Sequence, residues 1–181
     1  MVTRAVMAAV LLSAAPARPA SAPVPREEYE VKAAFLYHFA HLVEWPAPTL
    51  PGEPFVIAVV GHDPFAATLE QVLAGKSVRG QPVHVEPFDG AADQGDARIH
   101  VLFVGHGVGD HVRQALAAVA GQPILTVGDD AKFTDRGGMI AFRITSAGRV
   151  AFDISLQRAE QTGLRMSSQL LKLARIVGPA R

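Results

Sequence analysis

The stretch Phe55-Val56-Ile57-Ala58-Val59-Val60 decides the fold of this chain. An unbroken apolar run of this length, rich in β-branched residues, predicts a strand that is buried on both faces, as in a parallel sheet. Asp63-Pro64 follows almost at once and predicts a helix start, with Asp63 as the N-cap and Pro64 at the first helical position. A buried strand that leads into a helix indicates an α/β protein.

Strands and helices continue to alternate downstream of this unit. Turn residues separate the apolar runs, and period-two alternation on both sides of Ser146-Ala147-Gly148 predicts a β-hairpin. The predicted strands are 83–88, 99–104, 123–127, 139–145 and 149–155, and the predicted helices are 64–74, 108–120, 156–162 and 167–176. The order predicts a three-layer α/β/α sandwich with a mixed, mainly parallel sheet and a C-terminal β-hairpin.

Upstream of the first strand, a helix is predicted from Glu27 to the Trp45-Pro46 pair, because the residue before a proline avoids the α region. Its apolar residues recur at helical spacing. The stripe that we expect to face the core consists of Val31, Ala34, Phe35, His38 and Leu42.

Residues 1–22 have the three parts of a secretory signal peptide. Arg4 gives a positive start, residues 5–15 are apolar, and Ala20-Ser21-Ala22 is a small-x-small cleavage signal. The apolar part is too short to span a bilayer, which takes about 20 residues. We therefore expect a signal peptide at 1–22 and a single exported domain at 23–181, located in the periplasm of a bacterium with an outer membrane.

The composition excludes several classes of protein. Of 181 residues, 49% are hydrophobic and 19% charged, which is typical of a globular protein and too little charge for a disordered one. The 17 basic and 17 acidic residues balance, whereas a nucleic-acid-binding protein usually has a basic surplus. This chain has no Cys, which excludes disulfides, thiolate metal sites and a Cys nucleophile.

Gly105-His106-Gly107-Val108-Gly109 lies between a predicted strand and a predicted helix, where glycines let a phosphate approach backbone N–H groups. Asp129 follows at the spacing of a ribose-binding acid. However, the pattern is GxGxG instead of GxGxxG, and it follows the third strand. The alternative, a glycine-rich turn without a ligand, is favoured.

Two groups of histidines are candidate metal ligands: His38 and His41 with Glu44, and a second group at 106–111. Neither matches a defined zinc motif. The sequence also has no GxSxG or SxxK motif of a nucleophilic enzyme. We therefore predict no metal, no cofactor and no catalytic residue.

Two further features suggest binding. Asp153 shares one face of its strand with small residues, and Arg165 precedes the last helix; a carboxylate and a guanidinium together would hold a zwitterionic small ligand. A structural ion pair is the alternative. Trp45 ends its helix beside a proline-rich loop and is a candidate anchor for a protein partner, unless it only covers the core.

Four stretches together resemble one family. They are residues 30–37 (EVKAAFLY) with Phe39 and Trp45-Pro46, residues 124–129 (ILTVGD), Phe133 with residues 136–142 (RGGMIAF), and residues 163–174 (GLRMSSQLLKLA). The combination is similar to the YfiR family of periplasmic proteins over about residues 27–177.

The resemblance implies a non-enzymatic regulator. Proteins of the YfiR type repress a membrane-bound diguanylate cyclase by binding its periplasmic sensor region, which lowers cyclic-di-GMP and biofilm formation. They are typically dimeric, and envelope stress or redox state relieves the repression. A periplasmic small-ligand sensor that acts on another membrane partner is the alternative function.

This chain departs from the best-known member of the family, which carries disulfides, because it has no Cys. Switching must then come from a ligand or a partner. The motif residues themselves we interpret as structural: a turn delivers a strand, an aromatic ring packs beneath it, and a glycine-acid pair caps a short helix. These residues are Gly128, Asp129, Phe133, Gly137, Gly138 and Met139.

Overall fold

The computed structural model describes residues 25–46, 53–60, 64–88, 99–109 and 111–178. The predicted signal peptide and the predicted N-cap Asp63 lie outside the described residues. Among the described helices, none is long and apolar enough to cross a membrane.

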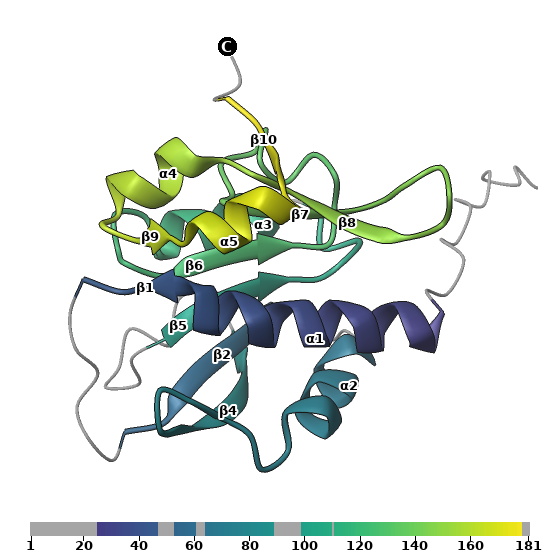
Figure 1. The fold of residues 1–181 in the computed structure, drawn as a ribbon, viewed down its shortest axis with the longest axis vertical. Helices are drawn as coiled ribbons and strands as arrows, with labels where there is room; N and C mark the ends of the chain where they lie inside the picture. Colours follow the sequence, from purple (N-terminus) through teal and green to yellow (C-terminus); the bar gives the residue numbers. More distant parts are fainter. Residues whose placement is uncertain (1–24, 47–52, 61–63, 89–98, 110, 179–181) are drawn as a thin grey trace, which may run out of the picture.

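The elements follow the predicted order, with several short strands added (Figure 1). The helices are α1 (Arg26–Leu42), α2 (Pro64–Leu73), α3 (His111–Ala118), α4 (Leu156–Gln161) and α5 (Ser168–Leu173). The longer strands are β2 (Phe55–Val60), β4 (Gln81–Phe88), β5 (Ile99–Val104), β6 (Leu125–Gly128), β7 (Ile140–Ile144) and β8 (Val150–Ile154). Two-residue strands are β1 (Val43–Glu44), β3 (Ser77–Val78), β9 (Arg165–Met166) and β10 (Arg175–Ile176).

Eight strands form one mixed, mostly parallel sheet in the order β10-β8-β7-β6-β5-β2-β4-β3, and β1 and β9 form a separate antiparallel pair. β2 lies between its parallel neighbours β4 and β5, and all six of its residues are buried. The predicted two-sided burial of 55–60 is thus confirmed. The predicted hairpin is also confirmed, since β7 and β8 pair antiparallel in the register Ile144↔Val150.

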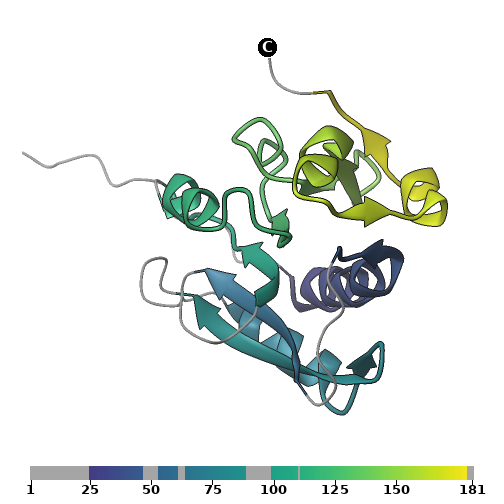
Figure 2. The ribbon, with the colours of Figure 1, turned by 90° about the vertical axis from the view of Figure 1, so that its left-hand side faces the viewer.

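The α/β/α layers follow from two cores on opposite faces of the sheet (Figures 1 and 2). The larger core joins α1, α2, α4 and α5 to one face, and the smaller core joins α3 to the other. Successive residues of β2 alternate between them, Ile57 in the larger and Ala58 in the smaller. This alternation is the period of a strand with both faces covered.

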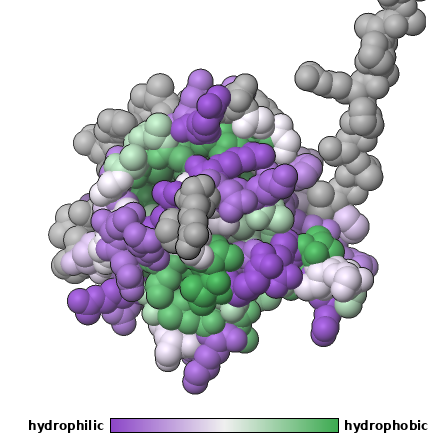
Figure 3. Space-filling view, turned by 90° about the horizontal axis from the view of Figure 1, so that it is seen from above, coloured by the Kyte–Doolittle hydropathy of each residue, from purple (hydrophilic) through white to green (hydrophobic). Residues whose placement is uncertain are grey.

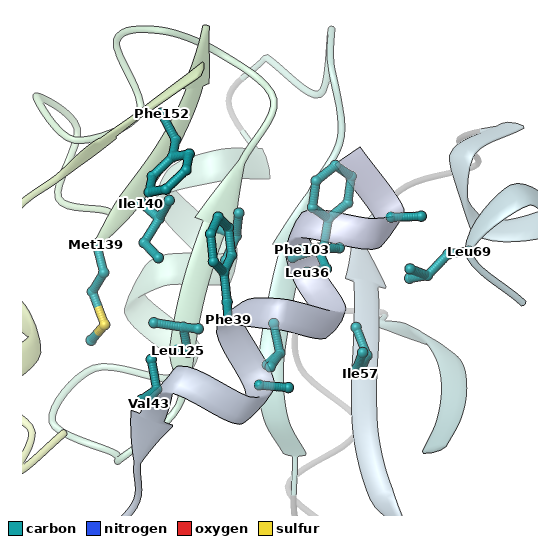
Figure 4. Packing of buried hydrophobic residues seen from close by; sticks show 14 of the residues in the cluster. Leu36, Phe39, Val43, Ile57, Leu69, Phe103, Leu125, Met139, Ile140 and Phe152 are labelled. Carbon is teal, nitrogen blue, oxygen red and sulfur yellow. The ribbon is translucent and has the colours of Figure 1, made fainter. Parts of the chain in front are cut away.

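Helix α1 supplies the centre of the larger core (Figure 4). The side chains of Leu36 and Phe39 are at most 1% exposed and point among side chains from β5, β6, β7 and β8. The predicted stripe of α1 is wrong in its rotation, because Val31 is 44% exposed and His38 and Ala34 are exposed as well. The residues that are buried instead are Tyr29, Lys32, Ala33, Leu36, Phe39 and Ala40.

The last predicted helix, 167–176, is wrong at its C-terminal end. The chain leaves the helix at Ala174, which has extended dihedral angles, and continues as β10 beside β8. Val177 donates a backbone hydrogen bond to Ile154 (2.9 Å), so the chain end adds a parallel strand to the sheet.

Candidate functional site

A cavity of about 850 Å³ lies between the β1–β9 pair and helices α4 and α5. Its walls combine apolar side chains with three charged ones and one aromatic ring. The lining residues are Glu44, Trp45, Pro46, Leu156, Glu160, Gly163, Leu164, Arg165, Met166 and Leu171. A volume of this size fits a small organic molecule.

Two segments that are more than a hundred residues apart line the cavity side by side. β1 and β9 pair in the register Val43↔Met166 and Glu44↔Arg165. Ser167 extends the contact by donating its backbone N–H to Leu42 (2.9 Å), and its hydroxyl caps α5 by accepting from the Leu170 amide. The end of α1 and the start of α5 are thereby joined into one wall.

Trp45 stands half-buried at the edge of this cavity. Its ring packs edge-on against Phe55 with 5.4 Å between the centroids, and the Arg79 guanidinium lies 5.7 Å from its centre. Arg79 also donates to the carbonyl of Val43 (2.7 Å). The indole Nε1 is buried and has no hydrogen-bond partner among the described residues. A buried donor of this kind costs free energy as long as it stays unpaired.

Gly163 keeps the mouth of the cavity close to Pro46. Its φ of +82° lies in the left-handed region, and a Cβ at this position would stand 3.3 Å from the Pro46 ring. The backbone conformation therefore favours glycine here, and a Cβ would also have to push the Pro46 ring aside slightly.

The charges at the cavity are arranged as a rim. Glu44, Glu160 and Arg165 are all exposed, whereas Leu164 is buried and Met166 is partly buried. An apolar floor with both signs of charge at its rim suits a small zwitterion with an apolar body, whose carboxylate and ammonium groups can find opposite charges.

The structure does not bring Asp153 to Arg165. Asp153 is 1% exposed, and its carboxylate accepts from Arg143 (2.8 Å to Nε) and from Arg175 (2.9 Å to Nε). A further contact joins the Arg175 Nη2 to the second oxygen, and the Asp153 carboxylate raises the pKa of Arg175. Asp153 thus forms structural ion pairs that hold β10 to the sheet, with Arg143 and Arg175 as its partners. Arg165 lines the cavity instead.

A buried ion pair links two of the sequence motifs. Lys32 is 2% exposed, and its Nζ lies 2.5 Å from Oδ1 of Asp129, which is 8% exposed. Glu28, one turn earlier on α1, also accepts from Lys32. Oδ2 of Asp129 has no partner among the described residues. The predicted capping by Asp129 is wrong, since the cap of the following turn is Asp130, whose carboxylate accepts from the Lys132 amide (2.9 Å).

The ring of Phe133 lies in a slot between two glycines. A Cβ on Gly128 would stand 2.2 Å from the ring, and one on Gly138 would stand 2.0 Å from it. Gly137 has a φ of +110°, and the chain then enters β7 with Met139 buried. The spacing of this motif is therefore a packing requirement, because any side chain at either glycine would displace the ring.

The described histidines of both groups contact neighbouring rings and backbone groups. No group of three or more His, Asp or Glu side chains there is arranged to hold a metal ion. Tyr37 packs against the rings of His38 and His41. His106 Nδ1 lies 3.2 Å from the backbone oxygen of Asp129, whose carboxylate is bound to Lys32 instead of projecting toward a ribose.

Sequence reasoning missed Lys32, Glu28 and the cavity residue Glu160, and it considered Glu44 only as a metal ligand beside His38 and His41. Lys32 lies in the motif EVKAAFLY, three residues after Tyr29 and four before Leu36. This helical spacing puts it on the same face as two large apolar residues, and that was the signal available in the sequence. The sequence does not show that Glu44 and Glu160 line one cavity, because their proximity depends on the β1–β9 pairing.

A model of the YfiR/HmsC-like family matches residues 29–175. The chain belongs to this family. The match includes every residue of the cavity, the Lys32–Asp129 pair and the Phe133 slot. The YfiR/HmsC-like family is one of regulatory, non-catalytic proteins of the periplasm.

The YfiR/HmsC-like chain is also similar in fold to the crystal structure of a conserved domain protein from Vibrio cholerae O1 biovar El Tor strain N16961. The TM-score is 0.54 at 14% sequence identity, over 82% of this chain. The match spans 59% of the Vibrio chain, and at this identity the likeness concerns the fold alone. No curated protein matches this chain.

Proposed function

We propose that this protein is a periplasmic regulator that binds the periplasmic sensor region of an inner-membrane diguanylate cyclase and represses it. Cyclic-di-GMP and biofilm formation then fall. The observation that carries the proposal is the family match over residues 29–175, which spans nearly all of the described domain. Export after removal of residues 1–22, a homodimeric state and the lack of catalysis belong to the same proposal.

Repression requires more than tight binding. A partner that exists in an active and an inactive form is shifted only by a protein that binds the inactive form better. Moving such a partner from 99% active to 99% inactive takes about 5.5 kcal/mol of differential affinity. With no Cys in the chain, release of the partner has to come from a ligand or another protein, and not from disulfide exchange.

Deletion of the gene in its host, with cyclic-di-GMP measured by mass spectrometry, tests the proposal. We expect the cyclic-di-GMP level to rise in the deletion strain, and a plasmid copy of the gene to bring it back to the wild-type level. A plasmid copy lacking residues 1–22 should not restore it, because that chain stays in the cytoplasm. Unchanged cyclic-di-GMP in a host that carries the cyclase gene would refute repression.

The cavity favours a second function, that of a small-ligand sensor. We propose that it binds a zwitterion such as an apolar amino acid, with Arg165 holding the carboxylate and the rim residues Glu44 and Glu160 facing the ammonium group. Calorimetry of the domain against a panel of amino acids tests this. Arg165→Ala should weaken binding at least tenfold, whereas Arg149→Ala, which removes an exposed arginine outside the cavity lining, should not. Equal binding by both variants would exclude the cavity.

A further inference from the structure

Arg158, on helix α4, is a partly buried arginine without a counter-charge. Other arginines of the C-terminal half bind carboxylates of the chain: Arg143 binds Asp153 (2.8 Å), and Arg136 binds Asp130 (3.1 Å). The Arg158 guanidinium makes no hydrogen bond and no ion pair within the described part of the chain. A partly buried charge that has no partner costs free energy, so a structural ion pair does not explain this side chain.

The guanidinium group lies against the loop that leads into β7. A Cβ on Gly137 would stand 3.6 Å from Nη1 and 3.8 Å from Cζ of Arg158, and 3.8 Å from a methyl group of Leu116 on α3. Gly137 therefore lies between a side chain of α4 and a side chain of α3. Because glycine has no side chain, this residue leaves the space beside Nη1 unfilled.

One side of the guanidinium group is buried and the other reaches solvent. Nε of Arg158 is buried and has no hydrogen-bond partner among the described residues. Nη1 and Nη2 make no hydrogen bond there either, but these two atoms are not buried. The protein thus holds the group in place by its stem and its Nε side, while both Nη atoms are open to a molecule in solution.

The Ser155 hydroxyl is one candidate acceptor for Arg158 inside the chain. Ser155 is the N-cap of α4, and Arg158 occupies the third helical position, whose side chain can reach back to the N-cap. Ser155 is 1% exposed, yet its Oγ has no partner among the residues that the structure describes. The hydroxyl therefore does not accept from Arg158, and the guanidinium donors remain available.

The charges around Arg158 indicate which kind of anion would fit. Arg136 is already paired with Asp130, and the exposed Asp135 adds a negative charge to the same loop. Arg158 then offers one uncompensated positive charge, which suits a singly charged carboxylate better than a phosphate dianion. A guanidinium group also binds both oxygens of a carboxylate through two parallel N–H donors. Seen from above, from the side on which Figure 1 has α4, polar and hydrophobic areas alternate on the surface (Figure 3), so no extended apolar face competes with this charge.

We propose that Arg158 is a carboxylate-binding site, in which Nη1 and Nη2 hold the anion beside Gly137. The carboxylate comes from a small organic acid or from an acidic side chain of a partner protein, and the two sources share this chemistry. Arg158 is not among the residues that line the cavity, so the site is separate from the zwitterion site. It also does not depend on the partner being a cyclase.

The arginine Nε–Hε signals in NMR spectra of the isotope-labelled domain test the site, and Arg158→Lys identifies the Arg158 signal by its loss. The probes are sodium acetate and a capped Ala-Glu-Ala tripeptide, each compared with sodium chloride at equal ionic strength. We expect the Arg158 signal to reach half-saturation at a carboxylate concentration at least tenfold lower than the signal of the exposed Arg149. Equal responses, or no shift, would overturn the proposal, because any surface arginine attracts carboxylates weakly.

The two probes distinguish the sources of the carboxylate. If the peptide binds at least as tightly as acetate, the site accepts an acidic side chain of a partner protein. Tighter binding of acetate restricts the site to small acids. If Asp135→Asn alone shifts the Arg158 signal as acetate does, the loop's own carboxylate fills the site, and the proposal is overturned.

A stability measurement separates binding from a structural role. Arg158→Met keeps the stem of the side chain and removes the charge, so we expect the urea midpoint to stay the same or to rise. Arg143→Met is the matched control and should lower the midpoint, because Arg143 binds the buried Asp153. A lower midpoint for Arg158→Met as well would show that the fold itself uses the charge, which would overturn the proposal.

Discussion

Replacing Lys32 by Met isolates the contribution of the buried ion pair. Lys32 and Asp129 are 2% and 8% exposed, and Glu28 is the second carboxylate on the same ammonium group. Met has nearly the shape of the lysine stem, so packing changes little while the charge is lost. Asp129 would then keep a buried negative charge without a cation, and Oδ2 already lacks a partner. Removing one member of a buried pair costs about 3–5 kcal/mol.

Urea denaturation of the domain measures this loss as a fall in midpoint at constant slope. In a thermal scan the same loss lowers Tm by roughly 6–20 °C, since a domain of this size shifts by about 2–4 °C per kcal/mol. Asp129→Asn in the Lys32→Met background should recover part of the stability, because the stranded charge is gone. The recovery separates the charge from the packing of the side chain.

The matched control is Arg26→Met on the same helix. Arg26 pairs with Glu30 at 3.2 Å, with both side chains at least half exposed, and such a pair is worth less than about 1 kcal/mol. If Lys32→Met lowers the free energy of unfolding no more than Arg26→Met does, the buried pair contributes nothing beyond a surface pair. The inference that the ion pair between motifs 30–37 and 124–129 stabilises the fold would then be refuted.

Gly138→Ala should destabilise the domain by about 1–3 kcal/mol, because its Cβ would meet the Phe133 ring, whereas Gly178→Ala, with nothing within 4 Å, should change the urea midpoint little. Asp153→Asn removes the anchor of β10, so hydrogen exchange at that strand should accelerate at least tenfold; unchanged exchange would show that the backbone pairing alone holds it. Trp45 is the single tryptophan of the chain, so a ligand that enters the cavity should shift its emission, and a saturating ligand that leaves the spectrum unchanged must bind elsewhere.

The sequence predicted those elements whose pattern reports directly on burial. The run at 55–60 is apolar throughout because β2 lies in a sheet that is covered on both faces. The hairpin follows from the period-two pattern of both strands and from Gly148, which adopts a φ of +71° in the turn. Neither needs knowledge of a distant residue.

The errors have one physical source, which is a distant partner that changes the meaning of a local pattern. A lysine on a helix normally marks the exposed face, so the pattern of α1 predicts that the side carrying Lys32 faces solvent. Lys32 is buried instead, because Asp129, 97 residues later in the chain, pairs with its charge. Residues 167–176 have helical character throughout, but pairing with β8 draws Arg175 into a strand. In the same way, the cavity exists only once β9 pairs with β1.

The cavity and the buried carboxylate of Asp153 are joined by a short stretch of chain. Leu171 lines the cavity from α5, and β10 begins four residues later with Arg175, which is bound to Asp153. A ligand that shifts α5 must therefore either strain the Arg175–Asp153 contact or move β10 along β8. In a chain without Cys, this connection offers a route from ligand binding to the edge of the main sheet that needs no disulfide.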